Sequence, residues 1–178
     1  MKEITTYIIA SFLTLTLFAQ NYSSTTYAYA STNGQPLALT NTDTLLHHSD
    51  TASSPLVSIG FAFTFSGQQY TDMSVSTDGF IRLGAKAILT DSNNLLMTNN
   101  YPMIAPLWDD LETLDTGTVV TKLLGVAPNR IRVVQWHVAR HMTDVDEYEN
   151  VVFQALLYER TGKIRFLYRY APINYEKY

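Results

Sequence analysis

Apolar and polar residues alternate along most of this chain with the period of two that marks half-buried β-strands. The clearest case runs from Leu56 to Phe65, where every second residue from Ile59 onward is aromatic or aliphatic. Short alternating strands joined by turns rich in glycine and proline predict an all-β fold, an antiparallel β-sandwich or jelly roll over residues 55–178. Further segments with this pattern are 118–124, 130–142, 151–160 and 164–170.

The central part of the chain carries the strongest local signals. A strand that alternates serine with apolar residues leads into Asp78-Gly79, a pair that predicts a hairpin turn, with a bulge as the alternative. The apolar run 103–108 contains Pro106, which cannot donate a ladder hydrogen bond, so we expect an edge strand or a bulged strand there. We expect Trp108, at the end of this run, to pack in the core with Trp136.

Residues 1–19 have the pattern of a secretory signal peptide. Lys2 supplies a positive charge, and an apolar run follows from Tyr7 to Ala19. A transmembrane anchor is the alternative, but the run is short for a span and no basic stop follows it. We therefore expect an N-terminal helix that is removed on export, after which no membrane span remains.

Residues 20–54 are rich in serine, threonine, asparagine and tyrosine, and we expect them to form lead-in strands and a loop before the sandwich domain. A short strand is expected at Leu37–Leu39, and a loop or irregular strand from Leu45 to Pro55. Within the domain, residues 93–97 are the one place where we expect a helical turn, and residues 143–150 are expected to form an acidic hairpin loop.

A hairpin of the form V-S-x-x-G-F-I-R-L-G, followed by P-x-I-A-P-x-W-D-D, resembles the nidogen-like extracellular domain. The similarity is closer still to related β-modules of large secreted and surface proteins of Gram-negative bacteria, and it spans Pro55 to Tyr170. The resemblance implies an extracellular interaction module without shared catalytic residues. The chain stops before the last strand and the sorting tail that such proteins often carry, which indicates a fragment of a longer multidomain protein. The matching residues are Val75, Ser76, Gly79, Phe80, Ile81, Gly84, Ile104, Ala105, Pro106, Trp108, Asp109 and Asp110.

Composition narrows the function classes. The chain has 178 residues, 46% of them apolar, which is enough to bury the core of one globular domain. A net charge of −4 argues against general nucleic-acid binding. The absence of cysteine excludes disulfides, thiolate metal sites and thiol catalysis. No G-x-S-x-G elbow or glycine-rich phosphate loop is present in the sequence, so we expect no catalytic residues.

The densest group of carboxylates is formed by Asp109, Asp110, Glu112 and Asp115. Hard oxygen ligands on a loop that leaves a strand can wrap a calcium ion, which makes calcium a candidate cofactor and these four residues its candidate ligands. The alternative is a solvated acidic loop, because no EF-hand spacing is present. A glycosidase acid–base pair needs carboxylates about 5–9 Å apart across a cleft, which neighbours on one loop rarely provide.

Two histidine pairs invite a metal interpretation that strand geometry opposes. The side chains of His47 and His48 are expected to point in opposite directions, because they are neighbours on an extended chain. His137 and His141 are expected about 13 Å apart on a strand, at ~3.3 Å per residue. We expect neither pair to chelate an ion.

These patterns and the resemblance together indicate a secreted, non-catalytic β-sandwich module at the cell surface or outside the cell. Its expected role is adhesion or contact with matrix or surface proteins, and its expected partner is an extracellular protein or glycan. Two alternatives stay open: a carbohydrate-binding or carbohydrate-active jelly roll, and a structural spacer of a larger surface protein. An exposed row of aromatic side chains beside a groove with paired carboxylates would favour the carbohydrate alternative.

Overall fold

A computed structural model describes residues 30–88, 102–142 and 147–169, without the side chains of residues 141, 142, 147 and 148. Ser31–Tyr178 forms one compact unit. The described residues form ten β-strands and no helix. The expected signal helix over residues 1–19 and the expected helical turn at 93–97 lie outside the described residues. No helix in the described part of the chain is long and apolar enough to cross a membrane.

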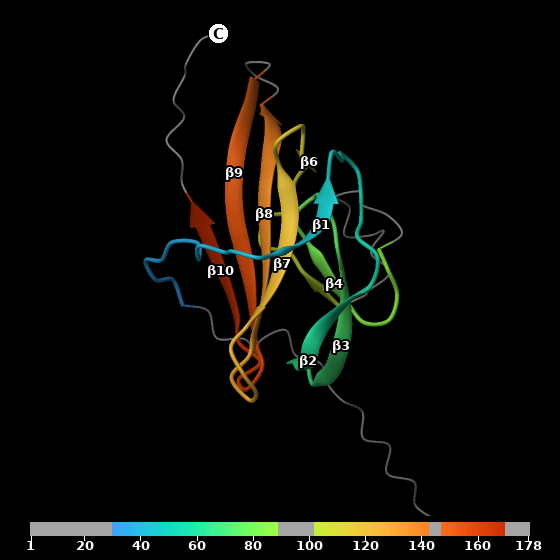
Figure 1. The fold of residues 1–178 in the computed structure, drawn as a ribbon, viewed down its shortest axis with the longest axis vertical. Coiled ribbons are helices and arrows are strands. Elements are labelled where there is room, and N and C mark those ends of the chain that lie inside the picture. Colours follow the sequence, from blue (N-terminus) through green and yellow to red (C-terminus); the bar gives the residue numbers. More distant parts are fainter. Residues whose placement is uncertain (1–29, 89–101, 143–146, 170–178) are drawn as a thin grey trace, which may run out of the picture. The chain divides into compact units, whose positions relative to one another are not determined.

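The larger of two antiparallel sheets is a meander extended at one edge (Figure 1). β6 (Leu111–Glu112) pairs with the end of β8, beyond the residues that pair with β7. Consecutive strands from β7 to β10 are neighbours, so the meander predicted from the alternating segments is confirmed. In spatial order the other strands are β1 (Asp43–His47), β7 (Thr118–Leu124), β8 (Ile131–Met142), β9 (Glu147–Tyr158) and β10 (Ile164–Arg169).

The smaller sheet has four strands. The predicted hairpin at Asp78-Gly79 is confirmed, because β3 and β4 pair on either side of it, with Val75 opposite Ile81. The predicted edge strand near Pro106 is also confirmed: β5 is two residues long and pairs only with β4 among the described strands. In spatial order the strands are β2 (Val57–Phe65), β3 (Gln68–Val75), β4 (Ile81–Leu83) and β5 (Met103–Ile104).

The two sheets pack face to face around one apolar core, which confirms the all-β sandwich. From β2, Phe61 and Phe63 enter this core with 6% and 0% of their surface exposed. From the larger sheet, the fully buried Trp136 stacks on the ring of Phe153 with the ring centroids 4.9 Å apart. Fully burying an aromatic or large aliphatic side chain contributes about 1.5–3 kcal/mol, so this layer supplies most of the folding free energy.

Trp108 lies beside this core rather than at its centre. Its ring contacts that of Phe80, with the centroids 5.4 Å apart, and the residue as a whole is only half-buried. The expectation that Trp108 and Trp136 would share one central position is therefore met by Trp136 alone. The physical reason is the short edge strand β5, which ends before Trp108 and leaves it at the rim of the smaller sheet.

The outer face of the larger sheet carries a second, smaller apolar cluster. Val133, Leu156 and Leu167 are buried there, and Leu39 packs against them. Leu39 belongs to a lead-in segment that crosses this face as an extended chain, seen in blue and cyan across β10 to β7 (Figure 1). The sheet is thus apolar on both faces, although only the inner face meets a second sheet.

The short strand expected at Leu37–Leu39 is wrong, because this segment crosses the sheet instead of running beside a strand. A crossing chain cannot form a ladder, and its backbone polar groups need other partners. The Gln154 side chain supplies them: its amide oxygen accepts from Leu37 N and its amide nitrogen donates to Leu37 O, both at 2.8 Å. Gln154 Nε2 also donates to Gln135 Oε1 at 2.6 Å.

Two strand boundaries differ from the sequence expectation. β1 occupies residues 43–47 with an irregular register, so the expected irregular strand is confirmed there but starts two residues before Leu45. β9 starts at Glu147, inside the segment expected to be an acidic loop, because β8 stays paired as far as Met142. In this extension Arg140 lies opposite Glu149, and their side chains form an ion pair at 2.7 Å.

A charge in the inter-sheet core should abolish folding. The Phe63→Asp variant removes a fully buried ring and leaves an unpaired carboxylate between the sheets. Removing a buried phenylalanine alone costs about 3–5 kcal/mol, a large part of the roughly 5–15 kcal/mol that stabilises a domain. We expect the cooperative thermal transition to disappear in circular dichroism. Ala62→Asp is the matched control, because Ala62 is the exposed neighbour on the same strand, and an unchanged melting curve for Phe63→Asp would contradict the assigned core.

Candidate functional site

The acidic segment after Trp108 is engaged in local contacts. Asp109 Oδ2 lies 3.5 Å from Arg140 Nη1, and Asp109 Oδ1 accepts from the backbone N–H of Asp110 at 3.0 Å. Arg140 also pairs with Glu149, so it bridges the Asp109 loop and β9. Asp110 itself is exposed. Asp109 therefore serves as one member of an ion-pair trio around Arg140.

The remaining two candidate calcium ligands lie apart from Asp109. Glu112 is in β6, opposite Ala139 of β8, and Asp115 is fully exposed, with Oδ1 3.9 Å from His48 Nδ1. No group of three or more histidine, aspartate or glutamate side chains in the described ranges is placed to hold a metal ion. Among the described residues, the four carboxylates therefore do not form a metal site.

The adjacent histidines do not diverge as expected. β1 ends at His47, and His48 has a positive φ of 46°, so the chain turns between them and is no longer extended. The rings of His47 and His48 consequently meet edge to face, with their centroids 5.2 Å apart. His137 lies in β8 opposite Thr118 and Val152, and the side chain of His141 is outside the described residues.

The first part of the motif that resembles the nidogen-like domain lies in a buried polar junction, made of residues 52–54 and 74–79, which we call the turn junction. Ser54 connects its two halves: its hydroxyl accepts from Val75 N at 2.9 Å, and its carbonyl accepts from the hydroxyl of Ser74 at 2.7 Å. Thr77 N donates to Ala52 O at 2.9 Å. These hydrogen bonds satisfy polar groups that would otherwise be buried without partners.

The turn junction also reaches the second sheet. Trp136 Nε1, from β8, donates to Ser76 O at 2.8 Å, and the carboxylate of Asp78 accepts from Leu111 N at 3.3 Å. Gly79 has a φ of 76°, and a Cβ at this position would lie 1.7 Å from Leu107 O. The motif therefore needs glycine for two reasons, the left-handed conformation and the passage of the Leu107 backbone.

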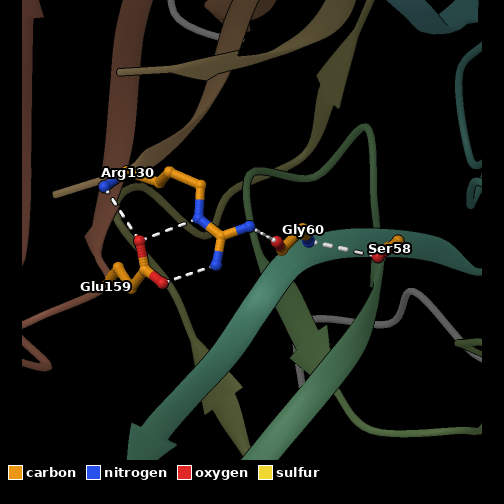
Figure 2. Close-up of polar contacts among 4 residues, drawn as sticks. All are labelled: Ser58, Gly60, Arg130 and Glu159. Atoms are coloured by element: carbon orange, nitrogen blue, oxygen red, sulfur yellow. Dashed lines mark hydrogen bonds and ion pairs between the residues drawn. The ribbon is translucent and has the colours of Figure 1, made fainter. Parts of the chain in front are cut away.

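One end of the sandwich is closed by a second polar contact between the sheets (Figure 2). Arg130, just before β8, binds Glu159 through two parallel hydrogen bonds of 2.8 and 2.5 Å. Its remaining nitrogen donates to Gly60 O of β2 at 2.6 Å, and the guanidinium lies 5.6 Å from the centroid of the Phe61 ring. The hydrogen bond holds the pKa of Glu159 below its ordinary value of 4.5, against burial, which raises it.

Arg132, two residues after Arg130 in the sequence, makes a similar contact with β2. It is 7% exposed, and its Nε donates to Ile59 O at 3.0 Å while Nη1 donates to the hydroxyl of Thr121 at 3.3 Å. Burial lowers the pKa of Arg132, and the charge of Asp43 raises it. The pairing of β2 with β3 shifts in register between Ser58 and Phe63, and this irregularity turns two successive carbonyls toward the two arginines.

The edge strand β10 exposes two large apolar side chains on one face. Phe166 and Tyr168 lie on the inner row of β10 and are 38% and 46% exposed. The Tyr168 ring stacks on Phe153 with the centroids 6.3 Å apart, and its hydroxyl donates to Pro106 O at 2.6 Å. The alternation of residues 164–170 is visible in the sequence, but the contact of this row with the rim of the smaller sheet at Pro106 is not.

A comparison with family models matches the "NIDO related" model over residues 18–177. The chain belongs to the NIDO-related family. Neither the curated proteins nor the solved structures contain a match to it. In this NIDO-related chain, the motif residues at the turn junction hold the two sheets together, so the family signature describes a fold. The surface residues of β10 lie outside that motif.

Glycine at position 79 should be required for stability, beyond its backbone conformation. Gly79→Ala introduces both a left-handed alanine and a clash with Leu107 O. Gly67→Ala is the matched control, because Gly67 has the same φ of 77° with nothing within 4 Å of a Cβ. We expect the control to lose about 1 kcal/mol in urea unfolding, and Gly79→Ala to lose about 1–3 kcal/mol more. Equal losses would show that the close approach is not a constraint.

The Arg130–Glu159 pair should contribute stability that depends on pH. Because the folded pKa of Glu159 is lowered, the stabilisation is present above about pH 4.5 and is lost as the pH falls through the folded value. Glu159→Gln should therefore melt at a lower temperature than the parent at pH 7, and the two melting temperatures should converge once the pH falls below the folded pKa of Glu159. The exposed Asp110→Asn is the control, and a difference that persists unchanged at low pH would contradict the assignment.

Proposed function

We propose that this chain is a non-catalytic extracellular interaction module that binds another protein through its surface. One observation carries the proposal: polar groups of the turn junction, and the side chain of Asp109, already bond to other parts of the fold. Ser76 accepts from Trp136, Asp78 accepts from Leu111, and Asp109 pairs with Arg140. Catalysis needs groups that face a substrate in addition to groups that hold the fold, and the carbonyl of Ser76 and the carboxylates of Asp78 and Asp109 already have structural partners.

Two further features support an extracellular location. Residues 1–19 have the charge and hydropathy pattern of an export signal, and the NIDO-related family suggests an extracellular β-module. The chain also contains no cysteine, so its stability in an oxidising compartment does not depend on disulfides. Adhesion or contact with a matrix or surface protein is the role that such a module fulfils.

Glycan binding is a second candidate, favoured by one observation. Phe166 and Tyr168 are neighbours on one row of β10 and both expose part of their rings. Flat aromatic faces beside one another can stack on successive sugar rings.

Binding measurements on the folded chain test the proposal. The protein is immobilised and titrated with a panel of extracellular matrix proteins and with a glycan array, in calcium and in EDTA. We expect saturable binding to a protein, with equal affinity in both buffers, and loss of that binding in Phe63→Asp. Binding to glycans alone that is lost in Tyr168→Ala would favour the second candidate. Turnover of a glycoside, or no binding across the panel, would contradict the proposal.

A further inference from the structure

Asn33 and Gly34 form the one Asn-Gly pair in the sequence, and both residues are exposed in the lead-in segment. Asparagine is a thermolabile residue, because the backbone nitrogen of the next residue can attack its side-chain amide carbon. Glycine at that next position places no side chain beside the attacking nitrogen and leaves the backbone free to rotate. The pair therefore combines a residue that can react with the neighbour that hinders the reaction least.

The backbone around Asn33 is not held in a ladder, because residues 30–42 belong to no strand. Among the described residues, the first backbone hydrogen bonds of this segment are those of Leu37 with Gln154, four positions after Asn33. The attack requires the Asn33 side chain and the Gly34 nitrogen to turn toward each other. A backbone that makes no hydrogen bonds at these two residues can make that rotation without breaking any.

Arg165 brings a positive charge to this pair. A Cβ on Gly34 would lie 2.8 Å from Arg165 Nη2, so the guanidinium lies against the glycine. Bond lengths then place Nη2 within about 6 Å of the Gly34 nitrogen. The ion pairs among the described residues do not include Arg165. Its charge favours loss of the Gly34 amide proton and stabilises the negative oxygen that forms when the nitrogen attacks.

Asp78-Gly79 offers a contrast within the same chain, because an Asp-Gly pair can close the same ring with loss of water. Asp78 is only 6% exposed, and its carboxylate accepts from Leu111 N at 3.3 Å. Its own N–H donates to the hydroxyl of Ser76 at 3.1 Å, and Leu107 O lies close against Gly79. Ring closure there would break these contacts, so packing protects the buried pair and leaves Asn33 as the reactive one.

We propose that Asn33 is a site of spontaneous deamidation in the folded protein and that Arg165 accelerates the reaction. The Gly34 nitrogen loses its proton and bonds to the side-chain amide carbon of Asn33, while the bond to the amide nitrogen breaks and ammonia leaves. Water then adds to either carbonyl of the succinimide ring, which opens to aspartate or isoaspartate. Both products place a carboxylate beside Arg165, so a neutral position becomes its ion-pair partner. The inference does not depend on the proposed function.

Peptide mapping by mass spectrometry, after incubation of the full-length chain in mildly alkaline buffer, tests the site. We expect isoaspartate at residue 33, which ring opening produces and direct hydrolysis does not. Asn41 is the matched control, because it is also exposed in the lead-in segment but precedes the β-branched Thr42. We expect its conversion to be at most about a tenth of that at Asn33. No isoaspartate at residue 33, or equal conversion at Asn41, would overturn the site.

The same maps test the protection of Asp78. We expect Asp78 to isomerise in urea and to stay unchanged in the folded chain over the period in which Asn33 reacts. Isomerisation of Asp78 in the folded chain at the rate of Asn33 would overturn the argument that the fold selects between the two pairs.

Arg165→Gln tests the role of the guanidinium. A unit charge about 6 Å away in water corresponds to about threefold in rate, so we expect deamidation to slow at least about threefold. Arg169→Gln is the matched control, because Arg169 is exposed on the same face of β10, and it should react at the parent rate. In urea the three chains should react equally, since the lead-in segment then leaves β10. Equal rates for the parent and Arg165→Gln without urea would overturn this role.

Arg165→Lys separates charge from packing. This variant keeps a positive charge beside Gly34 and should deamidate faster than Arg165→Gln. A rate as low as that of Arg165→Gln would show that the charge is not the cause.

Asn33→Asp reproduces one product and tests the new ion pair. We expect hydrogen–deuterium exchange of residues 31–36 to slow about twofold, and this effect to disappear when Arg165→Gln is added. Asn33→Gln stays neutral and should exchange like the parent. Equal exchange in Asn33→Asp with and without Arg165→Gln would overturn the ion pair.

Discussion

The two sheets of this protein depend on the hydrogen bond from the indole of Trp136 to the carbonyl of Ser76. An indole N–H buried between two apolar layers needs an acceptor, and the carbonyl of Ser76, at the turn after β3, supplies it. The turn after β3 must therefore enter the core and be satisfied there. The serines and the threonine around it, together with Gly79, follow from that requirement, because small polar side chains and a residue without Cβ let the backbone approach.

The fold could be predicted from the sequence wherever one face of a strand is buried and the other is not. Residues 57–65 and 131–142 alternate clearly, and their faces were assigned correctly. β1 was harder to predict because residues 43–47 lie at the margin of the core and show little alternation. The path of residues 31–42 could not be predicted at all, since it depends on the Gln154 side chain, which lies far along the chain.

The same distinction applies to the candidate site: its local features could be predicted from the sequence, but its contacts between distant segments could not. Local spacing indicated the acidic group that includes Asp109 and Asp115, but the sequence could not show that Arg140 neutralises Asp109 from another strand. The side chains of the two histidines were expected to point in opposite directions, but the positive φ of His48 turns the chain there. The aromatic row of β10 was visible as alternation, whereas its exposure depends on where β5 ends. Tertiary contacts between distant segments thus decide which polar and aromatic residues are left for binding.

The arginines of the larger sheet have two different surroundings. Arg130 and Arg132 face carbonyls of β2 and are consumed in closing the sandwich, while Arg165 and Arg169 border an edge that has no described neighbour. An edge strand with exposed aromatics would pair with many partners if it were neutral. Two arginines on its outer face repel a basic partner strand, and they also repel a second copy of β10. Positive charge on the outer face of β10 therefore opposes unselective pairing along the strand.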